Sequence, residues 1–195
     1  GMFAFGLWDN KEKKLFLVRD KFGEKPIYYA LYEDKFIFAS ELKAFEIFKK
    51  NLSIKIESVK EFLNLSYIPS PNTIYQNIYK LNQGTILTVN KKLFQNYNNR
   101  GFKNLDNNNT IKLINYWSQF NSNYKKNNYE NYEEYKNLVK NKLEKSVKQK
   151  MISDVPIGVF LSGGIDSSLV ASIMKSQSKT KINTFTISSK NSNFD

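Results

Sequence analysis

Apolar residues that alternate with small or polar ones dominate the first forty positions of the chain. Phe3, Phe5 and Leu7 form the first alternating run, and a polar turn begins at Asp9 and Asn10. Strict alternation predicts strands in which successive side chains point to opposite faces. Residues 3–39 are therefore predicted to form a β meander, with strands at 3–7, 15–18, 28–31 and 36–39.

Helical patterns follow this meander. Ser40 is predicted to begin a short helix, with Glu41 in its first turn. Ser58 and Glu61 have the spacing of a capping box and predict a second helix that begins there. Alternation returns after Gly84 and predicts another strand at residues 85–89.

The pattern is lost over residues 90–131, where 14 of the 42 residues are Asn. This bias predicts a linker or an expanded loop rather than a packed element. The aromatic pair Tyr116 and Trp117 is its clearest anchor. We place the linker at residues 91–131.

A period close to four returns at Tyr132 and predicts a helix with an apolar stripe that faces a core. The stripe consists of Tyr135, Val139, Leu143, Val147 and Met151. After Pro156 the chain predicts a buried strand at 157–161, a helix at 166–176 and a strand at 182–187. This order is typical of one βαβ unit of a parallel sheet.

The amino-acid composition excludes several kinds of catalytic and metal site. The 195 residues include no Cys and no His, so the chain itself holds no Ser-His-Asp triad, no Cys nucleophile, no disulfide and no ordinary zinc site. A metal ion would need oxygen ligands, which favours Mg²⁺. The net charge of +12 comes almost entirely from lysines spread along the chain, so we expect a solvated surface and no nucleic-acid partner. No apolar run is long enough for a membrane span, and no signal peptide is visible.

The segment from Val159 to Ser168 carries the candidate chemistry. A predicted strand ends in Ser162-Gly163-Gly164, and Asp166 opens the next helix. Glycine amides can approach phosphate oxygens closely, and a helix N-terminus attracts anions. The hydroxyl groups of Ser162 and Ser167 are further candidate donors. A carboxylate beside phosphate makes chemical sense as a Mg²⁺ ligand.

Other interpretations of this loop are weaker. It lacks the Lys of a Walker loop and the third glycine of a dinucleotide fingerprint. An ordinary helix cap made by the Ser and Asp side chains is the structural alternative.

Residues 162–168, S-G-G-I-D-S-S, resemble the S-G-G-x-D-S loop of the ATP pyrophosphatase superfamily. The preceding stretch 153–161 is similar to that of the glutamine-hydrolysing asparagine synthases. The first half resembles the class II glutamine amidotransferase domain of the same enzymes. The similar segments are residues 1–5, 19–20, 22–29, 39–44, 67–74 and 116–117.

The resemblance implies α+β followed by α/β architecture. Residues 1–90 would be the C-terminal part of an Ntn-type α/β/β/α amidotransferase sandwich. Residues 132–195 would begin a parallel-sheet ATP pyrophosphatase domain, similar to the adenine nucleotide α-hydrolases. We expect the chain to be an internal fragment of a cytoplasmic enzyme, and the resemblance alone suggests a homodimer.

The family's reaction would use glutamine, aspartate and ATP. Ammonia from glutamine displaces AMP from a β-aspartyl-AMP intermediate and gives asparagine, AMP and pyrophosphate. The resemblance implies ATP and Mg²⁺ as cofactors, with Asp166 as the metal ligand. It assigns nucleotide contacts to Leu161, Ser162, Gly163, Gly164, Asp166, Ser167, Ser168 and Ile187. We assign no catalytic residue within the chain, because the N-terminal Cys nucleophile is missing, and we expect the chain itself to hydrolyse no glutamine and make no asparagine.

Three alternatives remain at this stage. A β-lactam synthetase-like amide ligase shares the two-domain build and does not need the Cys. An RNA-modifying enzyme with the same loop would fit the basic charge. A non-catalytic nucleotide-binding remnant would fit the missing Cys. Arg19 and Asp20 are expected to form only a local ion pair.

Overall fold

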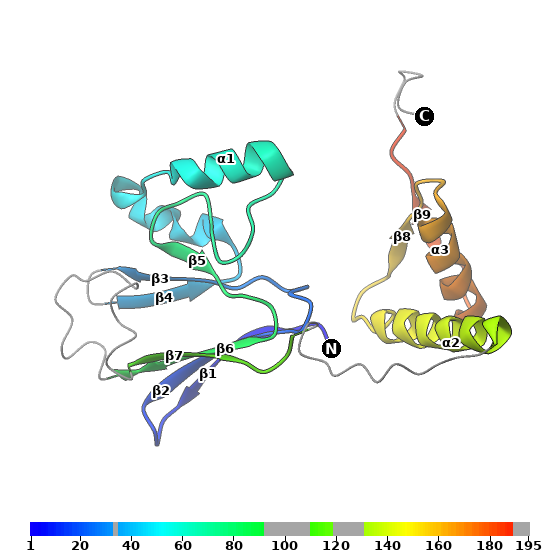
Figure 1. Cartoon of the computed structure of the whole chain (residues 1–195), viewed down its shortest axis with the longest axis horizontal. Coiled ribbons are helices and arrows are strands. Elements are labelled where there is room, and N and C mark those ends of the chain that lie inside the picture. The colour runs from blue at the N-terminus through cyan, green and yellow to red at the C-terminus, as the bar shows by residue number, and fades with distance from the viewer. Residues whose placement is uncertain (33–34, 92–109, 119–130, 189–195) are drawn as a thin grey trace. The chain divides into compact units, whose positions relative to one another are not determined.

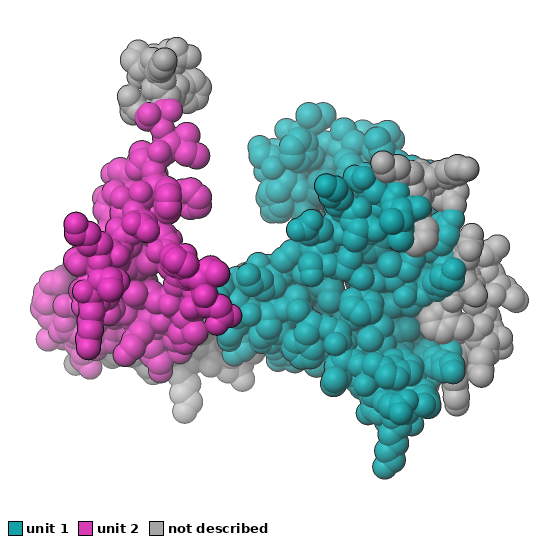
Figure 2. All heavy atoms as spheres, turned by 180° about the vertical axis from the view of Figure 1, so that it is seen from behind, with its two compact units in different colours: residues 1–124 teal, residues 125–195 magenta. Residues whose placement is uncertain are grey.

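The computed structural model describes residues 1–32, 35–91, 110–118 and 131–188. The chain divides into two compact units, residues 1–124 and 125–195 (Figure 2). Each unit has its own secondary structure, and we describe them separately. None of the described helices combines the length and the apolar character that a membrane crossing requires.

Unit 1 contains two antiparallel sheets. The four-stranded sheet has the order β1–β2–β6–β7, and the three-stranded sheet has the order β4–β3–β5. The strands are β1 (Ala4–Asp9), β2 (Lys14–Arg19), β3 (Tyr28–Tyr32), β4 (Lys35–Ala39), β5 (Ile78–Lys80), β6 (Thr85–Asn90) and β7 (Ile111–Asn115). The predicted strands of residues 3–39 are confirmed, but the expectation of one meander is wrong, because β2 pairs with β6 and β3 pairs with β5.

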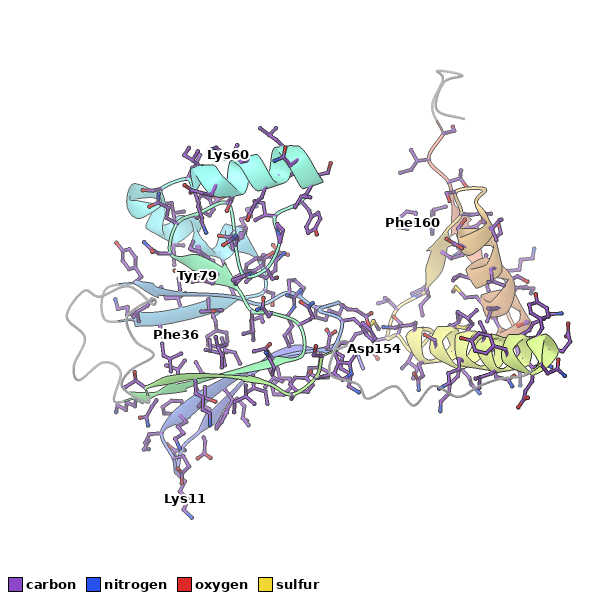
Figure 3. All side chains as sticks on the ribbon, in the orientation of Figure 1. Lys11, Phe36, Lys60, Tyr79, Asp154 and Phe160 are labelled. Atoms are coloured by element: carbon purple, nitrogen blue, oxygen red, sulfur yellow. The ribbon has the colours of Figure 1, made fainter. Side chains whose placement is uncertain are left out.

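The main core of unit 1 fills the space between the two sheets (Figure 3). Tyr29 and Leu31 of β3 point into it, whereas Ala30 points to the other face of the same strand. This is the two-residue period of a strand buried on both faces. Leu17 and Leu87 contribute to the same core from the four-stranded sheet and are fully buried.

Helices lie on the other side of the three-stranded sheet (Figure 1). They are the 3-10 helix η1 (Leu42–Asn51) and α1 (Ile56–Leu65). Phe45 of η1 is buried against Ala30 and Ile78, which fixes η1 on the sheet. Three layers in the order helix, sheet, sheet are therefore visible in unit 1.

The capping box predicted for α1 is wrong. The helix begins two residues earlier, with Lys55 as its N-cap, and the buried Oγ of Ser58 has no hydrogen-bond partner among the described residues. Glu61 instead accepts hydrogen bonds from the amide of Asn72, and Asn72 accepts one from the Nζ of Lys55. The i and i+3 spacing was present, but Ser58 makes no capping bond and Glu61 has its partner, Asn72, outside the helix end.

The outer face of the four-stranded sheet is also apolar. Strand register places Phe5 and Leu7 of β1 on the same face as Val18 and Phe16 of β2, to which they are paired. Ile86 of β6 continues this face. In the described part of unit 1 both helices cover the other sheet, and Leu7 is 57% exposed.

One strand lies inside the predicted linker. β7 pairs with β6 over five residues, from Val89 with Ile111 to Thr85 with Asn115. No strand was predicted here, because this short apolar run lies within an Asn-rich stretch. The aromatic pair Tyr116 and Trp117 follows β7 directly, and both residues donate backbone hydrogen bonds to the carbonyl of Gly84.

Unit 2 consists of α2 (Tyr132–Lys150), β8 (Gly158–Phe160), α3 (Ile165–Gln177) and β9 (Asn183–Phe185). β8 and β9 pair in parallel, so the predicted βαβ unit is confirmed. Asn131 caps α2 by accepting the N–H of Glu133. The amide of Gln177 at the end of α3 donates to the carbonyl of Glu144, which joins the two helices.

Two burial predictions for unit 2 are wrong. The strand at 157–161 was expected to be buried, but Phe160 of β8 is 75% exposed. The stripe of α2 was expected to face a core, but no residue of this helix is buried and Tyr135 is about half exposed. Two strands and two helices are too few to cover both faces of a parallel sheet, which such sheets normally require.

Candidate functional site

Seven of the eight predicted site residues lie at the junction between β8 and α3. Residues 161–164 connect the two elements, and α3 begins at Ile165. The eighth, Ile187, lies two residues beyond the end of β9. Because Phe160 pairs with Phe185, both chain segments leave the sheet at the same edge. This is the carboxyl edge, where parallel α/β sheets bind ligands.

Leu161 joins the two segments through its backbone. Its N–H donates to the carbonyl of Phe185 at 2.9 Å, and its carbonyl accepts the hydroxyl of Thr186 at 2.7 Å. Thr186 was not among the site residues predicted from the sequence, although it is next to the predicted Ile187. Within the contacts of the described residues, the second lone pair of the Leu161 carbonyl is the backbone site that stays available to a ligand.

The first turn of α3 carries no side-chain cap. Its N-cap is Gly164, in an extended conformation and without a capping hydrogen bond. The first N–H groups of a helix have no partner within it. The alternative of an ordinary cap made by the Ser and Asp side chains is therefore wrong. These N–H groups and the positive end of the helix dipole are directed to the loop, where an anion is favoured.

Gly163 gives the loop its shape. Its φ of +79° lies in the left-handed region, where a side chain causes strain. Apart from its two chain neighbours, no atom of the described residues lies within 4 Å of the position that a Cβ would take. The backbone on this side of the loop is thus open, and its conformation explains why a glycine stands here.

The three serines of the loop differ in their contacts. The Oγ of Ser167 lies 3.1 Å from the Oγ of Ser162, accepts the N–H of Ser162 at 3.3 Å and donates to the carbonyl of Gly164 at 3.1 Å. Among the described residues, the exposed hydroxyl of Ser168 takes part in no hydrogen bond, although its N–H donates to Gly164.

Asp166 is exposed in the first turn of α3. Within the described ranges, no three acidic, His or Cys residues gather into a metal cage. A single carboxylate suits Mg²⁺, which commonly takes one or two protein carboxylates together with phosphate oxygens and water. The residues of this loop therefore fit a magnesium ion that arrives with a phosphate group.

A second polar centre lies in unit 1, at Arg19 and Asp20. The guanidinium of Arg19 is buried and donates to the carbonyls of Gly23, Lys25 and Leu81 at 2.6, 3.0 and 2.6 Å. Burial lowers the pKa of Arg19, and the nearby charge of Asp20 opposes this effect.

Asp20 accepts four backbone N–H groups. The donors are Phe3, Phe22, Glu24 and Lys25, at 3.3, 3.0, 3.0 and 3.0 Å. Burial acts to raise the pKa of Asp20, but these four hydrogen bonds outweigh it, and the pKa lies below its ordinary value.

The expected Arg19–Asp20 ion pair is absent among the described contacts. Neighbouring residues on a strand point to opposite faces, so the two side chains find backbone partners instead. The hydroxyl of Tyr116 donates to the carbonyl of Arg19 at 2.6 Å and ties β7 to this centre.

The chain is similar to two families. Residues 1–99 match the glutamine amidotransferase domain family, and residues 138–195 match the asparagine synthase family. The loop of unit 2 lies inside the second match.

Individual relatives cover both units. The chain is 36% identical to putative asparagine synthetase [glutamine-hydrolyzing] 2 of Methanocaldococcus jannaschii, over 96% of this chain and 33% of the relative. It is 31% identical to asparagine synthetase [glutamine-hydrolyzing] 1 of Bacillus subtilis, over 90% of this chain and 24% of the relative. A further relative is amidase chry2 of Gibberella zeae, 28% identical over 89% of this chain and 23% of the relative. The chain thus spans about a quarter to a third of the length of these proteins.

Proposed function

The chain belongs to the glutamine amidotransferase domain family. From this membership we propose that it is part of an ATP-dependent, glutamine-hydrolysing asparagine synthetase. Residues 1–90 would belong to the amidotransferase domain, and residues 132–195 would carry the nucleotide loop. The asparagine synthase match over 138–195 supports the second assignment. The finer folds that we propose are an Ntn-type sandwich and an ATP pyrophosphatase domain.

One observation carries the proposal. A loop with a left-handed Gly163 leads from the carboxyl end of a parallel strand into a helix whose first turn has no side-chain cap. Such a helix start supplies unpaired N–H groups and a positive dipole end for a phosphate chain. A purely structural helix start more often satisfies one of those donors with a Ser, Thr, Asp or Asn side chain.

The residues of the loop would have distinct tasks. The backbone of Gly163 and Gly164, with the hydroxyl groups of Ser162, Ser167 and Ser168, would hold the pyrophosphate part of ATP. Asp166 would hold Mg²⁺, which supplies charge neutralisation between the phosphates. Leu161 and Ile187 would contact the adenine or ribose through their backbones.

The proposed reaction activates a carboxylate. An oxygen of the aspartate side chain attacks the α-phosphorus of ATP, and the bond to the β-phosphate oxygen breaks. Pyrophosphate leaves with that electron pair, and its negative charge stays in the loop. Ammonia then attacks the acyl carbon of the β-aspartyl-AMP, AMP leaves, and one proton is released. The leaving group makes the otherwise unreactive carboxylate an acyl donor.

Equilibrium binding of MgATP to the 195-residue chain tests the nucleotide assignment. We expect saturable binding that pyrophosphate competes away. Replacement of Asp166 by Asn should weaken the dependence on Mg²⁺. Ser172→Ala is the matched control, because Ser172 is exposed on the same helix but outside the loop. Absence of MgATP binding, or equal behaviour of D166N and S172A, would contradict the proposal.

A further inference from the structure

Strand β1 forms one edge of the four-stranded sheet in unit 1, and among the described strands only β2 pairs with it. The carbonyl of Phe3, just before β1, accepts the N–H of Asp20 at 2.9 Å. In an antiparallel strand, the backbone groups of every second residue point to the same side. Every second residue from Phe3 onward therefore faces β2, and the residues between them direct their N–H and C=O groups to the open side. These outward-facing residues are Ala4, Gly6 and Trp8.

This edge lacks the features that normally prevent strand pairing. Residues 4–8 contain no charge and no proline, and the side chains of Phe5, Leu7 and Trp8 are 46, 57 and 48% exposed. Natural sheet edges are usually protected by lysines, prolines or bulges, and an exposed apolar edge is a site where another strand adds to the sheet. The opposite edge of the same sheet, β7, has the exposed Lys112 within its five residues and is protected in this way.

The edge is complementary to itself. In an antiparallel pair of two β1 strands with the two-fold axis at Gly6, the two glycines lie opposite each other, and Ala4 of each copy lies opposite Trp8 of the other. All three outward-facing residues then exchange their backbone hydrogen bonds with the second copy. The large Trp8 side chain meets the small Ala4, and any other register places Ala4 or Trp8 opposite a residue outside β1.

The same register also matches the apolar side chains. Phe5 of one copy lies directly opposite Leu7 of the other, on the outer face that both residues share with Phe16 and Val18 of β2. Cross-strand apolar pairs of this kind stabilise a sheet. The pairing therefore covers part of the exposed apolar face as well as the unpaired backbone groups.

From this complementarity we propose that β1 of the 195-residue chain pairs antiparallel with β1 of a second copy and joins two four-stranded sheets into one. Stable interfaces bury roughly 1,200–2,000 Å², and a contact of one short strand is smaller, so we expect a weak dimer with a Kd on the order of 10–100 μM. Each copy has a net charge of +12, so the copies repel each other, and added salt should strengthen the association. The proposal is independent of nucleotide binding in unit 2.

Sedimentation equilibrium at concentrations below and above this Kd tests the proposal with a matched pair of variants. Leu7→Lys places a charge opposite Phe5 of the second copy and brings two lysines close to the two-fold axis, so it should weaken dimerisation about tenfold or more. Leu113→Lys introduces the same charge on β7, where the leucine is 55% exposed, and should leave the dimer unchanged. Far-UV circular dichroism confirms that both variants are folded. A monomer at every concentration, or equal weakening by the two variants, would overturn the proposal.

The register is tested by disulfide formation. The chain contains no cysteine, so a single introduced cysteine can crosslink only with another copy. Directly opposite side chains lie about 4.5–5.5 Å apart, whereas diagonal ones lie about 7–8 Å apart. An equimolar mixture of Phe5→Cys and Leu7→Cys should therefore form a crosslinked dimer several-fold faster than either variant alone. Equal rates in the three samples would contradict the two-fold pairing at Gly6.

Hydrogen exchange identifies what covers the edge. By NMR, the amides of Gly6 and Trp8 should become protected as the protein concentration rises through the Kd, because their N–H groups then donate to the second copy. Protection that does not change with concentration would show that another part of the same chain covers β1, and it would refute the proposal. Fast exchange of both amides at the highest concentration would refute it as well.

Discussion

Replacement of Asp20 by Asn should destabilise unit 1 severely. The carboxylate is 1% exposed, and each of its oxygens accepts two backbone N–H groups. Oδ1 accepts the N–H groups of Phe22 and Glu24, whereas Oδ2 accepts those of Phe3 and Lys25. Asn has the same shape but only one acceptor oxygen, so in either orientation its NH₂ group faces two N–H donors. The substitution therefore removes two of the four hydrogen bonds and leaves two of the backbone N–H donors without this acceptor.

The structure sets the size of the effect. A hydrogen bond to a charged group contributes about 1.5 to 3 kcal/mol, so two of them correspond to about 3 to 6 kcal/mol. This is a large part of the roughly 5 to 15 kcal/mol that stabilise a domain. Asp9→Asn is a matched control, because Asp9 accepts both of its N–H bonds, from Lys11 and Glu12, on Oδ1 alone. Asn can supply that single oxygen, and we expect a cost below about 1 kcal/mol.

Urea unfolding followed by tryptophan fluorescence measures both costs. The two tryptophans of the chain, Trp8 and Trp117, lie in unit 1, so the signal reports on this unit. Linear extrapolation gives the free energy of unfolding of each variant. A cost of D20N below about 1 kcal/mol, or no larger than that of D9N, would refute the argument that four backbone donors depend on this carboxylate.

Three further predictions concern the same unit and the whole chain. Because the folded pKa of Asp20 lies below its ordinary value, the unfolded state binds more protons in acid. Unit 1 should therefore lose stability as the pH falls from about 4 through the folded pKa, and urea midpoints of D20N should vary less with pH. Gly84→Ala should cost more than about 2 kcal/mol in the same urea assay, since Gly84 has a φ of +62° and a Cβ would collide with the carbonyl of Trp117. A smaller cost would mean that the turn adapts. The chain contains no cysteine, so it should release no ammonia from glutamine in a coupled glutamate dehydrogenase assay, and measurable release would contradict this expectation.

Local patterns in the sequence predicted most elements correctly. Alternation located the strands of residues 3–39 and 85–89, and the four-residue spacing located α2. The order of strand, loop, helix and strand after Pro156 predicted the parallel pair β8 and β9. Because ligands bind at the carboxyl edge of such sheets, the position of the loop also followed from the sequence.

These local patterns could not predict which residues far apart in the sequence pair with one another. Alternation identifies the two faces of a strand but does not say which strand lies beside it. The separation of the strands into two sheets, and the pairing of β7 with β6, depend on contacts between residues far apart in sequence. For the same reason Ser58 and Glu61 resembled a capping box, although Glu61 bonds to Asn72.

The site shows the same division. Residue types and spacing identified the loop from Ser162 to Ser168, because glycines and a helix start have a local chemical meaning. Only the three-dimensional arrangement made one serine a bridge and left its neighbour exposed, and only it turned Arg19 and Asp20 away from each other toward backbone groups. A hydroxyl or a charge can have several partners, and which of them lies within hydrogen-bonding distance is decided by the packing of the whole unit.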